Sequence, residues 1–463
     1  MTWGERLQPA PMSRIAVVAP QDHLRDALVA LAIRGTVELE TADERGDDRA
    51  AEALRHVEQL VRSSAVAAIS SEALDIKRLE GERRADLLAG EVELGHRAAA
   101  AVTTDRTAIS VGWAATDDLP TIAAALQPLG VDVVELPRPR WAEPPTLLRP
   151  AHLARAFRLL VDTYGTVRYA DIDPTVFAGI TFVVMFGMMF GDVGHGFLLA
   201  AGGLWLRSTS RPALAAARRV WAIPFAAGLA AAGFGVLYGE AFGPTGLPAL
   251  WLKPLESPGR LLLAGGAIGG LLLACSQALG TVNRWREHGA VAAVLAPSGV
   301  AGLLMLVALA GGAVAWGMNS AVLVWFSVTM AATGVVLLAV GAFRTATAGA
   351  GRAAEAAVEL FDALLRVATN AVSFTRLAAF GLMHAAVGEV VWKATVGLFG
   401  GLVGTVAAAA MFVVGNAVAF GLEALVAGVQ ALRLEYYELF SRVFAGEGRP
   451  FRPWHLPLVP AKE

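Results

Sequence analysis

Among the ionisable side chains within the last two long apolar stretches of the chain, five are placed where their chemistry could act inside a membrane. They lie in residues 358–391 and 396–436 and are Asp362, Arg376, His384, Glu423 and Arg433. A charge at the centre of a bilayer costs at least about 2.5 kcal/mol, so each arginine needs a carboxylate partner or a water-filled cavity. Arginine keeps its proton, whereas carboxyl and imidazole groups can exchange theirs. These residue types indicate proton or cation movement through a membrane.

The spacing of these groups separates the acids from the arginines. At about 1.5 Å and 100° per helical residue, Asp362 and Arg376 project in directions about 40° apart around the helix axis but lie ~21 Å apart along that axis. Glu423 and Arg433 lie about 80° and ~15 Å apart. Neither pair can form an ion pair within its own helix. This spacing predicts two water-filled cavities that enter the membrane from opposite sides and end at a positively charged barrier. The alternative is a buried structural salt bridge for each arginine, and a packed polar role for His384.

A glycine-rich polar motif interrupts an earlier apolar stretch, residues 174–206. The motif is FGMMFGDVGHG and contains Gly187, Gly191, Asp192, Gly194, His195 and Gly196. Because glycines permit a turn and the two polar side chains can satisfy backbone groups, we expect a turn at residues 191–196, with Asp192 and His195 mainly forming and packing it. Glu240, in a YGE motif, is expected at a membrane boundary on the lumenal side.

The composition is that of a membrane protein. Apolar residues make up 56% of the 463, charged residues only 17%, and the mean hydropathy is +0.55. Of the 78 charged residues, 47 lie in residues 1–173, so a soluble part precedes a membrane part. The net charge of -2 argues against nucleic acid as a partner. A single cysteine, Cys275, excludes an intrachain disulfide framework, and no spacing suggests a metal site or a bound cofactor.

The soluble part, residues 1–173, is predicted to hold two small α/β units joined by a helical arm. The first unit has strands at 14–20 and 35–40 around a helix at 22–33, and the second covers 109–136. Between them, residues 47–102 are expected to form a helical pair or short coiled coil, with an apolar stripe at Leu54, Val57, Val61, Leu74, Leu79, Leu87 and Leu88. We find no phosphate-binding loop or nucleophile elbow, so this part is expected to be a docking platform.

Eight membrane spans with both ends cytoplasmic agree best with the arginines in the loops. Apolar stretches number seven, and no signal peptide opens the chain, so the soluble part is expected inside. The arginine-rich loop 207–219 is then cytoplasmic only if residues 174–206 cross twice, as a tight helical hairpin. The predicted fold is therefore mainly helical, with an N-terminal α/β and coiled-coil domain at 1–173, an eight-helix membrane domain at 174–454 and a cytoplasmic tail at 455–463. Either Met1 or Met12 could be the true start.

Several motifs resemble the membrane stator subunit of rotary V-type and A-type ATPases, called subunit a or subunit I. They are the motif at 186–196, YGE at 238–240, SFTRL at 373–377 with His384, Glu423 followed by LRL at 432–434, the entry at 164–174 and the tail at 444–451. The resemblance covers about residues 12–454. It implies that two long tilted helices face a ring of rotor proteolipid subunits. In that arrangement Arg376 and Arg433 would separate two half-channels. Glu423 and Asp362 would be the acids of the half-channels, and His384 would line a channel.

The resemblance also implies partners and a place in the cell. The chain would assemble with the rotor ring, peripheral-stalk subunits and other ATPase subunits in the plasma membrane, with lipid around it. ATP chemistry would belong to partner subunits, so no catalytic site is expected here. Arginine outnumbers lysine 34 to 4, a hint of a GC-rich bacterial source.

The soluble part departs from the family pattern, being about half the usual length, and this reduces the expected contacts to peripheral stalks. Two alternatives stay open. A secondary cation transporter would show internal repeats with matched broken helices, and we see none. A purely structural stator would be expected to lack Arg376, Arg433 or Glu423, and all three are present. The sequence leaves open whether the ion is H⁺ or Na⁺ and whether ATP is hydrolysed or made.

Overall fold

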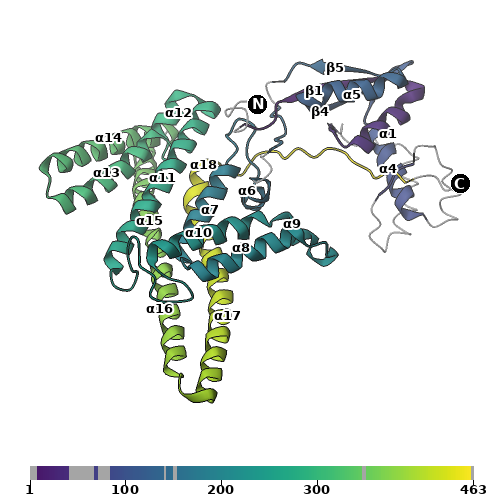
Figure 1. Ribbon diagram of the computed structural model, residues 1–463. Helices are drawn as coiled ribbons and strands as arrows, with labels where there is room; N and C mark the ends of the chain where they lie inside the picture. Colours follow the sequence, from purple (N-terminus) through teal and green to yellow (C-terminus); the bar gives the residue numbers. More distant parts are fainter. Residues whose placement is uncertain are drawn as a thin grey trace. The chain divides into compact units, whose positions relative to one another are not determined.

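The computed structural model describes residues 8–40, 67–70, 84–139, 142–149, 154–346 and 351–459 (Figure 1). Its contacts divide the chain into two compact units. The first, which we call the sheet unit, is built from residues 9–148 and 448–463. The second, which we call the membrane unit, contains residues 149–447.

The sheet unit holds strands and three longer helices in the order expected for two α/β units. The strands are β1 (Met12–Pro20), β2 (Val37–Leu39), β3 (Val102–Thr103), β4 (Thr107–Ala115) and β5 (Asp132–Leu136). The helices are α1 (Leu24–Arg34), α4 (Ala85–Ala99) and α5 (Leu119–Leu126), with short 3-10 turns at Gln21–His23, Thr116–Asp118 and Gln127–Leu129. Gly35, with φ of 57°, ends α1 in the left-handed conformation that glycine adopts without strain.

The two expected α/β units are one layer, because their strands interleave in a single antiparallel sheet of order β2-β4-β1-β5 with β3 beside β4. β1 pairs along its whole length with β4, and on its other edge with β5. The apolar side chains of β1, α1 and α5 meet in one core. The expectation of two separate small units was therefore wrong, since neither pair of strands completes a sheet without the other.

The helical arm is described only in part. Helix α4 lies within the predicted arm, and its Leu87 and Leu88 are buried as expected of an apolar stripe. The stripe residues Leu54, Val57, Val61, Leu74 and Leu79 lie outside the described residues.

Residues 449–459 form part of the sheet unit's core although they come last among the described residues. Trp454 and Leu456 are buried in the core around α1 and β1. The Trp454 amide donates to the carbonyl of Val37 at 2.9 Å, and its indole donates to Glu93 at 2.8 Å. The tail therefore contributes to the unit's hydrophobic core as well as to its hydrogen bonds.

The membrane unit is helical. Its helices are α6 (Arg158–Tyr164), α7 (Thr175–Met189), α8 (Val193–Ser208), α9 (Ala215–Arg219), α10 (Ala222–Tyr238), α11 (Pro258–His288), α12 (Ala290–Leu295), α13 (Val300–Met318), α14 (Ala321–Thr345), α15 (Arg352–Ser373), α16 (Thr375–Gly397), α17 (Gly401–Leu434) and α18 (Ser441–Val443). Single 3-10 turns lie at Ala154–Ala156 and Pro212–Leu214, and a π-helical turn at Glu435–Phe440 joins α17 to α18.

Five helices of the described residues are long and apolar enough to cross a membrane, or six if the bent pair Pro212–Arg219 and Ala222–Tyr238 is one span. Helices α7 and α8 have 15 and 16 residues, or about 22 and 24 Å of length, less than a ~30 Å hydrocarbon core. The chain is thus a multi-pass membrane protein by composition and helix length. The eight-span count and the orientation of the ends stay predictions.

The helix break in residues 174–206 exists but is shorter than expected. Helix α7 ends at Met189 and α8 begins at Val193, so Gly194, His195 and Gly196 lie in the first turn of α8 and not in a turn between helices. The predicted break over 191–196 is confirmed at Gly191 and Asp192 and was wrong for residues 193–196, because Asp192 caps α8 and allows the helix to start earlier. Helices α7 and α8 both pack on α10 far more extensively than on each other, so the hairpin is not tight.

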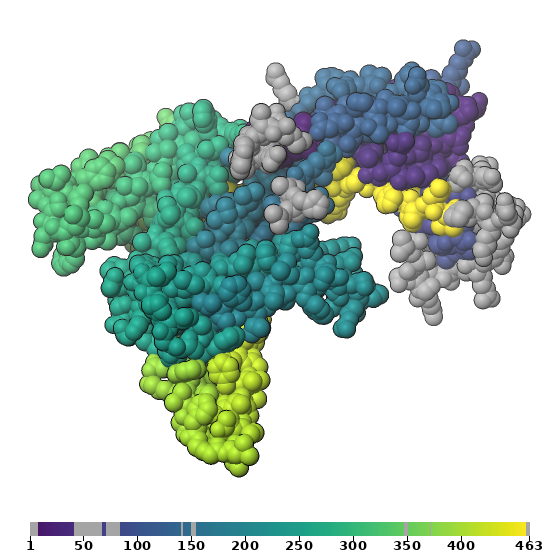
Figure 2. All heavy atoms as spheres, viewed as in Figure 1, coloured from purple at the N-terminus to yellow at the C-terminus, as the bar shows by residue number. Residues whose placement is uncertain are grey.

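The two C-terminal apolar stretches are long but interrupted. The stretch 358–391 lies in α15 and α16, which meet at a turn at Phe374 but together form one candidate membrane span, Arg352–Gly397, where the sequence analysis expected one tilted helix. Helix α17 has 34 residues and packs along α16 (Figure 1). In the view of Figure 2, the connected ends of α16 and α17, coloured yellow-green, stand clear of the other helices of the membrane unit.

Candidate functional site

The polar centre of the membrane unit is a hydrogen bond between α16 and α17. His384 Nδ1 and the Glu423 carboxylate form this bond, and both residues are buried. Neighbouring positions on both helices are small or apolar, including Ala385 on α16 and Ala427 on α17. The close packing of the helices brings together two groups that are 39 residues apart in sequence. Both were predicted as site residues, but their direct bond was not.

Arg376 lies in the first turn of α16 and is half-buried between two polar partners. Its Nη1 donates to Gln430 Oε1 on α17 at 3.5 Å, and its Nη2 lies 3.8 Å from Glu438 Oε1. Glu438 is buried in the π-helical turn and belongs to no regular stretch of α17. The sequence analysis required a carboxylate or water for this arginine. It did not identify Glu438, because a partner 62 positions away leaves no spacing signal.

Two predicted site residues lie apart from this group. Arg433 is exposed on α17, with no hydrogen bond or ion pair to any described residue. Asp362 is on α15, before the break at Phe374, and is exposed with an ion pair to Arg366 one helical turn away. The structure therefore brings His384 and Glu423 together, places Arg376 about 12 Å further along α16, and leaves Asp362 outside the buried group.

The start of α8 lies against the His384 ring. The Asp192 carboxylate accepts hydrogen bonds from the backbone N–H groups of His195, at 2.8 Å, and Gly243, at 3.3 Å. The His195 ring centroid lies 5.7 Å from that of His384. Asp192 caps the helix, which the sequence analysis did not predict, and it and His195 also belong to the buried polar group, which the expectation of a packing role missed.

Glu240 and the motif glycines set the backbone around this group. The carbonyl of Glu240 accepts from the N–H of Val193 at 2.9 Å, and Glu240 itself is 8% exposed. A Cβ on Gly196 would lie 2.4 Å from the backbone N of Ala232, so α8 and α10 can touch only with glycine there. Close contacts to α10 or to the segment after it also surround Gly187, Gly191 and Gly194.

A second polar cluster lies where the chain enters α7. Arg168 bonds Glu447 at 2.5 Å and Glu287 at 3.4 Å, and Arg284 bonds Glu287 at 2.9 Å. Asp171 is fully buried beside these groups, and neither of its carboxylate oxygens has a hydrogen-bond partner among the described residues. Burial, and then the nearby Glu287 carboxylate, raise the pKa of Asp171 to about 7.

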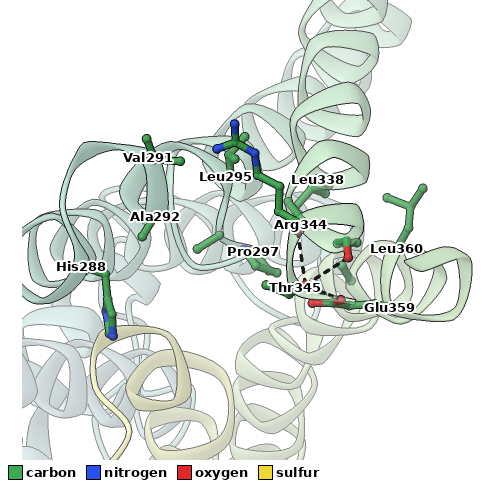
Figure 3. Close-up of a pocket in the computed structure, with 14 residues that line it drawn as sticks. His288, Val291, Ala292, Leu295, Pro297, Leu338, Arg344, Thr345, Glu359 and Leu360 are labelled. Carbon is green, nitrogen blue, oxygen red and sulfur yellow. Dashed lines mark hydrogen bonds between the residues drawn. The ribbon is translucent and has the colours of Figure 1, made fainter. Parts of the chain in front are cut away.

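A cavity of about 350 Å³ lies between α12, α14 and α15, away from the polar centre (Figure 3). Its wall is mainly apolar, with side chains such as Leu295, Leu338 and Leu360. At one end Thr345 donates a hydrogen bond to Glu359 at 3.0 Å. None of the predicted site residues lines it.

Comparisons with known proteins point to one family. Residues 98–228 match the model of the V-type ATPase 116kDa subunit family. The A-type ATP synthase subunit I of Aeropyrum pernix is 29% identical over 69% of this chain and 52% of its own length. That of Halobacterium salinarum is 28% identical over 65% of this chain and 50% of its own. The human V-type proton ATPase 116 kDa subunit a 3 is 37% identical over 26% of this chain and 15% of its own.

The chain spans about half the length of the longest-matching of these relatives. The family matched is the one that the motifs resemble.

Proposed function

We propose that this chain, a relative of subunit a of V-type ATPases and subunit I of A-type ATP synthases, is the membrane stator of a rotary ATPase. In this role it forms two ion half-channels against a ring of rotor proteolipid subunits and couples proton translocation to ATP hydrolysis or synthesis in partner subunits. The observation that carries the proposal is the arrangement of Arg376, His384 and Glu423 on two long adjacent helices.

A second observation supports a protein partner along α17. Exposed apolar side chains recur along this helix at Val414, Val418, Leu422, Leu425 and Val429, and Arg433 continues the series. At about 100° per residue these six positions fall within about 100° of one face. An apolar face alone could contact lipid, but an arginine on the same face would be costly there. A rotor subunit with a membrane carboxylate fits both the apolar face and its cation.

The proposed mechanism depends on the fixed charge of Arg376. A proton enters one half-channel and neutralises a rotor carboxylate, which can then pass through lipid as the ring turns. When the carboxylate reaches Arg376, the guanidinium favours its ionised form, and the proton leaves by the other half-channel. Gln430 and Glu438 hold the guanidinium between the helices, and the arginine remains protonated throughout.

The other groups line the two paths. His384 and Glu423 form a buried pair about 12 Å along α16 from Arg376, at a depth suited to one half-channel. Asp362, exposed on α15, is assigned to the opposite half-channel, and Arg433 adds a second positive charge to the barrier.

The sheet unit is proposed to dock onto peripheral-stalk subunits and to have no catalysis of its own. Both ends of the chain would be cytoplasmic, and the membrane would be the plasma membrane of a bacterium. The translocating domain would be residues 174–447, and not 174–454 as the sequence analysis expected, because residues 448–459 belong to the sheet unit. Cysteine labelling at position 211 from outside intact cells would contradict this orientation.

The test is ATP-driven proton uptake into vesicles that hold the whole complex. Arg376→Ala should abolish uptake while the subunit stays assembled, and Arg376→Lys should be severely impaired because a desolvated ammonium can lose its proton. Arg433→Ala should reduce proton uptake less than Arg376→Ala does. Arg260→Ala, which removes an exposed arginine at the start of α11, is the matched control and should pump normally.

Three outcomes separate the alternatives. Uptake by Arg376→Ala at near wild-type rates would contradict the barrier role. Restored uptake when Arg376 and Glu438 are both replaced by apolar residues would instead favour a structural ion pair. Ion movement by the purified chain without rotor subunits would favour a secondary transporter.

A further inference from the structure

Three buried metal-binding side chains meet where α8 begins beside α16. Asp192, His195 and His384 each place one potential ligand atom within 4.8 Å of the other two. Their residues are 1%, 2% and 5% exposed. No other such group of three or more occurs among the described residues.

Local structure holds two of the three groups in place. The Asp192 carboxylate caps α8 and accepts from the His195 N–H, which keeps both residues on the same first turn. The Phe190 ring lies 5.8 Å from the His195 ring and 5.0 Å from the His384 ring, measured between centroids. Phe242 packs edge-on against His195 at 5.2 Å. These aromatic rings limit how far the imidazoles can turn away.

The His195 imidazole is weakly partnered for a side chain that is 2% exposed. Neither Nδ1 nor Nε2 forms a hydrogen bond of good geometry with a described residue; Nδ1 lies 3.8 Å from Asp192 Oδ1, and the Asn416 side chain also interacts with the ring. Leaving a buried polar group unsatisfied costs about 1–3 kcal/mol, so such a group in a folded protein needs an explanation. A ligand bound by the imidazole nitrogen would supply one.

His384 carries the hydrogen-bonding pattern of a metal-binding histidine. Its Nδ1 bonds the Glu423 carboxylate, which leaves Nε2 available for a metal. Histidines that bind metals commonly give their other ring N–H to a carboxylate, which fixes the tautomer and raises the basicity of the ligand. Glu423 is placed to do this for His384.

We propose that Asp192, His195 and His384 bind a divalent transition-metal ion of the Zn²⁺ class. Two imidazoles and one carboxylate are a usual three-residue zinc ligand set, with water in the fourth position. At metal–ligand distances of about 2.0–2.2 Å, the ligand atoms of a tetrahedral site lie about 3.3–3.6 Å apart. The ligand atoms, which lie within 4.8 Å of one another, would have to approach by about 1 Å to reach that separation.

Bound metal would also affect ion movement, a consequence that rests on the proposed function. The ion would occupy the Nε2 of His384 and place a positive charge beside the Glu423 half-channel. Zn²⁺ would therefore inhibit proton uptake by the whole complex.

The binding test uses the full-length chain purified in detergent, stripped with a chelator and dialysed against Zn²⁺. We expect about one zinc ion per chain, with X-ray absorption showing a first shell of nitrogen and oxygen and the outer-shell scattering of imidazole. Co²⁺ in its place should give the intense visible bands of a four-coordinate site. Zinc that is absent, or that lacks imidazole ligands, overturns the proposal.

Two variants and a control locate the site. His195→Ala should lose the bound ion. Asp192→Asn should weaken binding at least tenfold while keeping the helix cap, because asparagine caps helices as well as aspartate does. His288→Ala removes an exposed histidine at the end of α11 and should retain the ion. Equal zinc binding by His195→Ala and wild type would overturn the assignment, and the wild-type spectra decide the matter if that variant does not fold.

The inhibition test is separate. Proton uptake by the wild-type complex should fall with micromolar Zn²⁺ and recover when a chelator is added. Inhibition of the residual uptake by Asp192→Asn should need a Zn²⁺ concentration at least tenfold higher. Zinc bound at these residues without any inhibition would retain the site but contradict the proposed half-channel role of His384.

Discussion

His384 on α16 and Glu423 on α17 form a buried hydrogen-bonded pair that joins two long neighbouring helices of the membrane unit. The second carboxylate oxygen of Glu423 has no partner among the described residues. Polar groups in this position hold their helices in one register, because sliding either helix would leave both groups unpaired. The pair is therefore structural as well as a candidate for ion transfer.

Removing one member of this pair should destabilise the chain more than removing both. His384→Leu leaves the Glu423 carboxylate buried without its partner, a loss of about 3–5 kcal/mol, whereas the double change His384→Leu with Glu423→Leu should recover much of it. Thermal unfolding of the purified chain in detergent measures both. Additive losses in the double variant would mean that the two side chains do not interact.

A methyl group on Gly196 should separate α8 from α10. Its Cβ would lie 2.4 Å from Ala232 N and 2.7 Å from Gly228 O, which are backbone atoms that cannot move aside cheaply. We expect Gly196→Ala to lower the free energy of unfolding by about 1–3 kcal/mol. Gly202→Ala is the control on the same helix, because a Cβ there meets nothing within 4 Å. It should be neutral or stabilising by up to about 1 kcal/mol, and equal effects would contradict the close packing.

Asp171 should make stability fall as pH rises. Its pKa is about 7 in the folded chain, against an ordinary value of 3.8 for an aspartate in water, so the folded state binds more protons between those values. The contribution of this group to the free energy of unfolding is fully present below about pH 4. It falls as the pH rises towards about 7, by up to about 1.4 kcal/mol per pH unit. The measurement is the unfolding temperature of wild type minus that of Asp171→Asn across this range.

The control for this titration is Asp162→Asn, which removes an exposed carboxylate that pairs with Arg158. That variant should follow the wild-type pH profile. A constant difference between wild type and Asp171→Asn from pH 4 to 7 would mean that Asp171 stays ionised throughout.

The tail should stabilise the sheet unit through Trp454. Trp454→Ala removes a side chain that is 5% exposed and its bond to Glu93, and should cost about 3–5 kcal/mol. Leu458→Ala, at a position 47% exposed on the same tail, should cost less than about 1 kcal/mol. Hydrogen exchange of the β1 and α1 amides in the full chain reports the change. Unaltered protection in Trp454→Ala would exclude a core role for the tail.

Local patterns in the sequence predicted most of the elements. The strands and helices of the α/β part, the apolar stretches and the interruption before α8 follow from hydrophobic periodicity and from glycines, which act within a few residues. The sequence also predicted which types of residue form the site, because a charge inside an apolar stretch is costly however the helices pack. The motifs indicated a resemblance to one family, and the comparisons point to the same family.

Pairings between distant segments could not be predicted in this way. No spacing rule joins Arg376 to Glu438 or His195 to His384, because those contacts depend on how the helices pack. The break at Phe374 was missed because residues 358–391 contain no proline and their hydrophobic pattern continues across it. The merging of two expected α/β units into one sheet was missed for a similar reason, since strand order is a tertiary property.

The tail that completes the sheet unit has a consequence for biogenesis. Residues 9–148 leave the ribosome first, but Trp454 and Leu456 follow only after the whole membrane unit has been synthesised. During that interval the apolar surface beside α1 and β1 lacks its cover, which exposes it to chaperones and proteases. In a chain whose membrane unit stalls during insertion, this apolar surface would thus stay exposed, and it would be covered only once the tail has been translated.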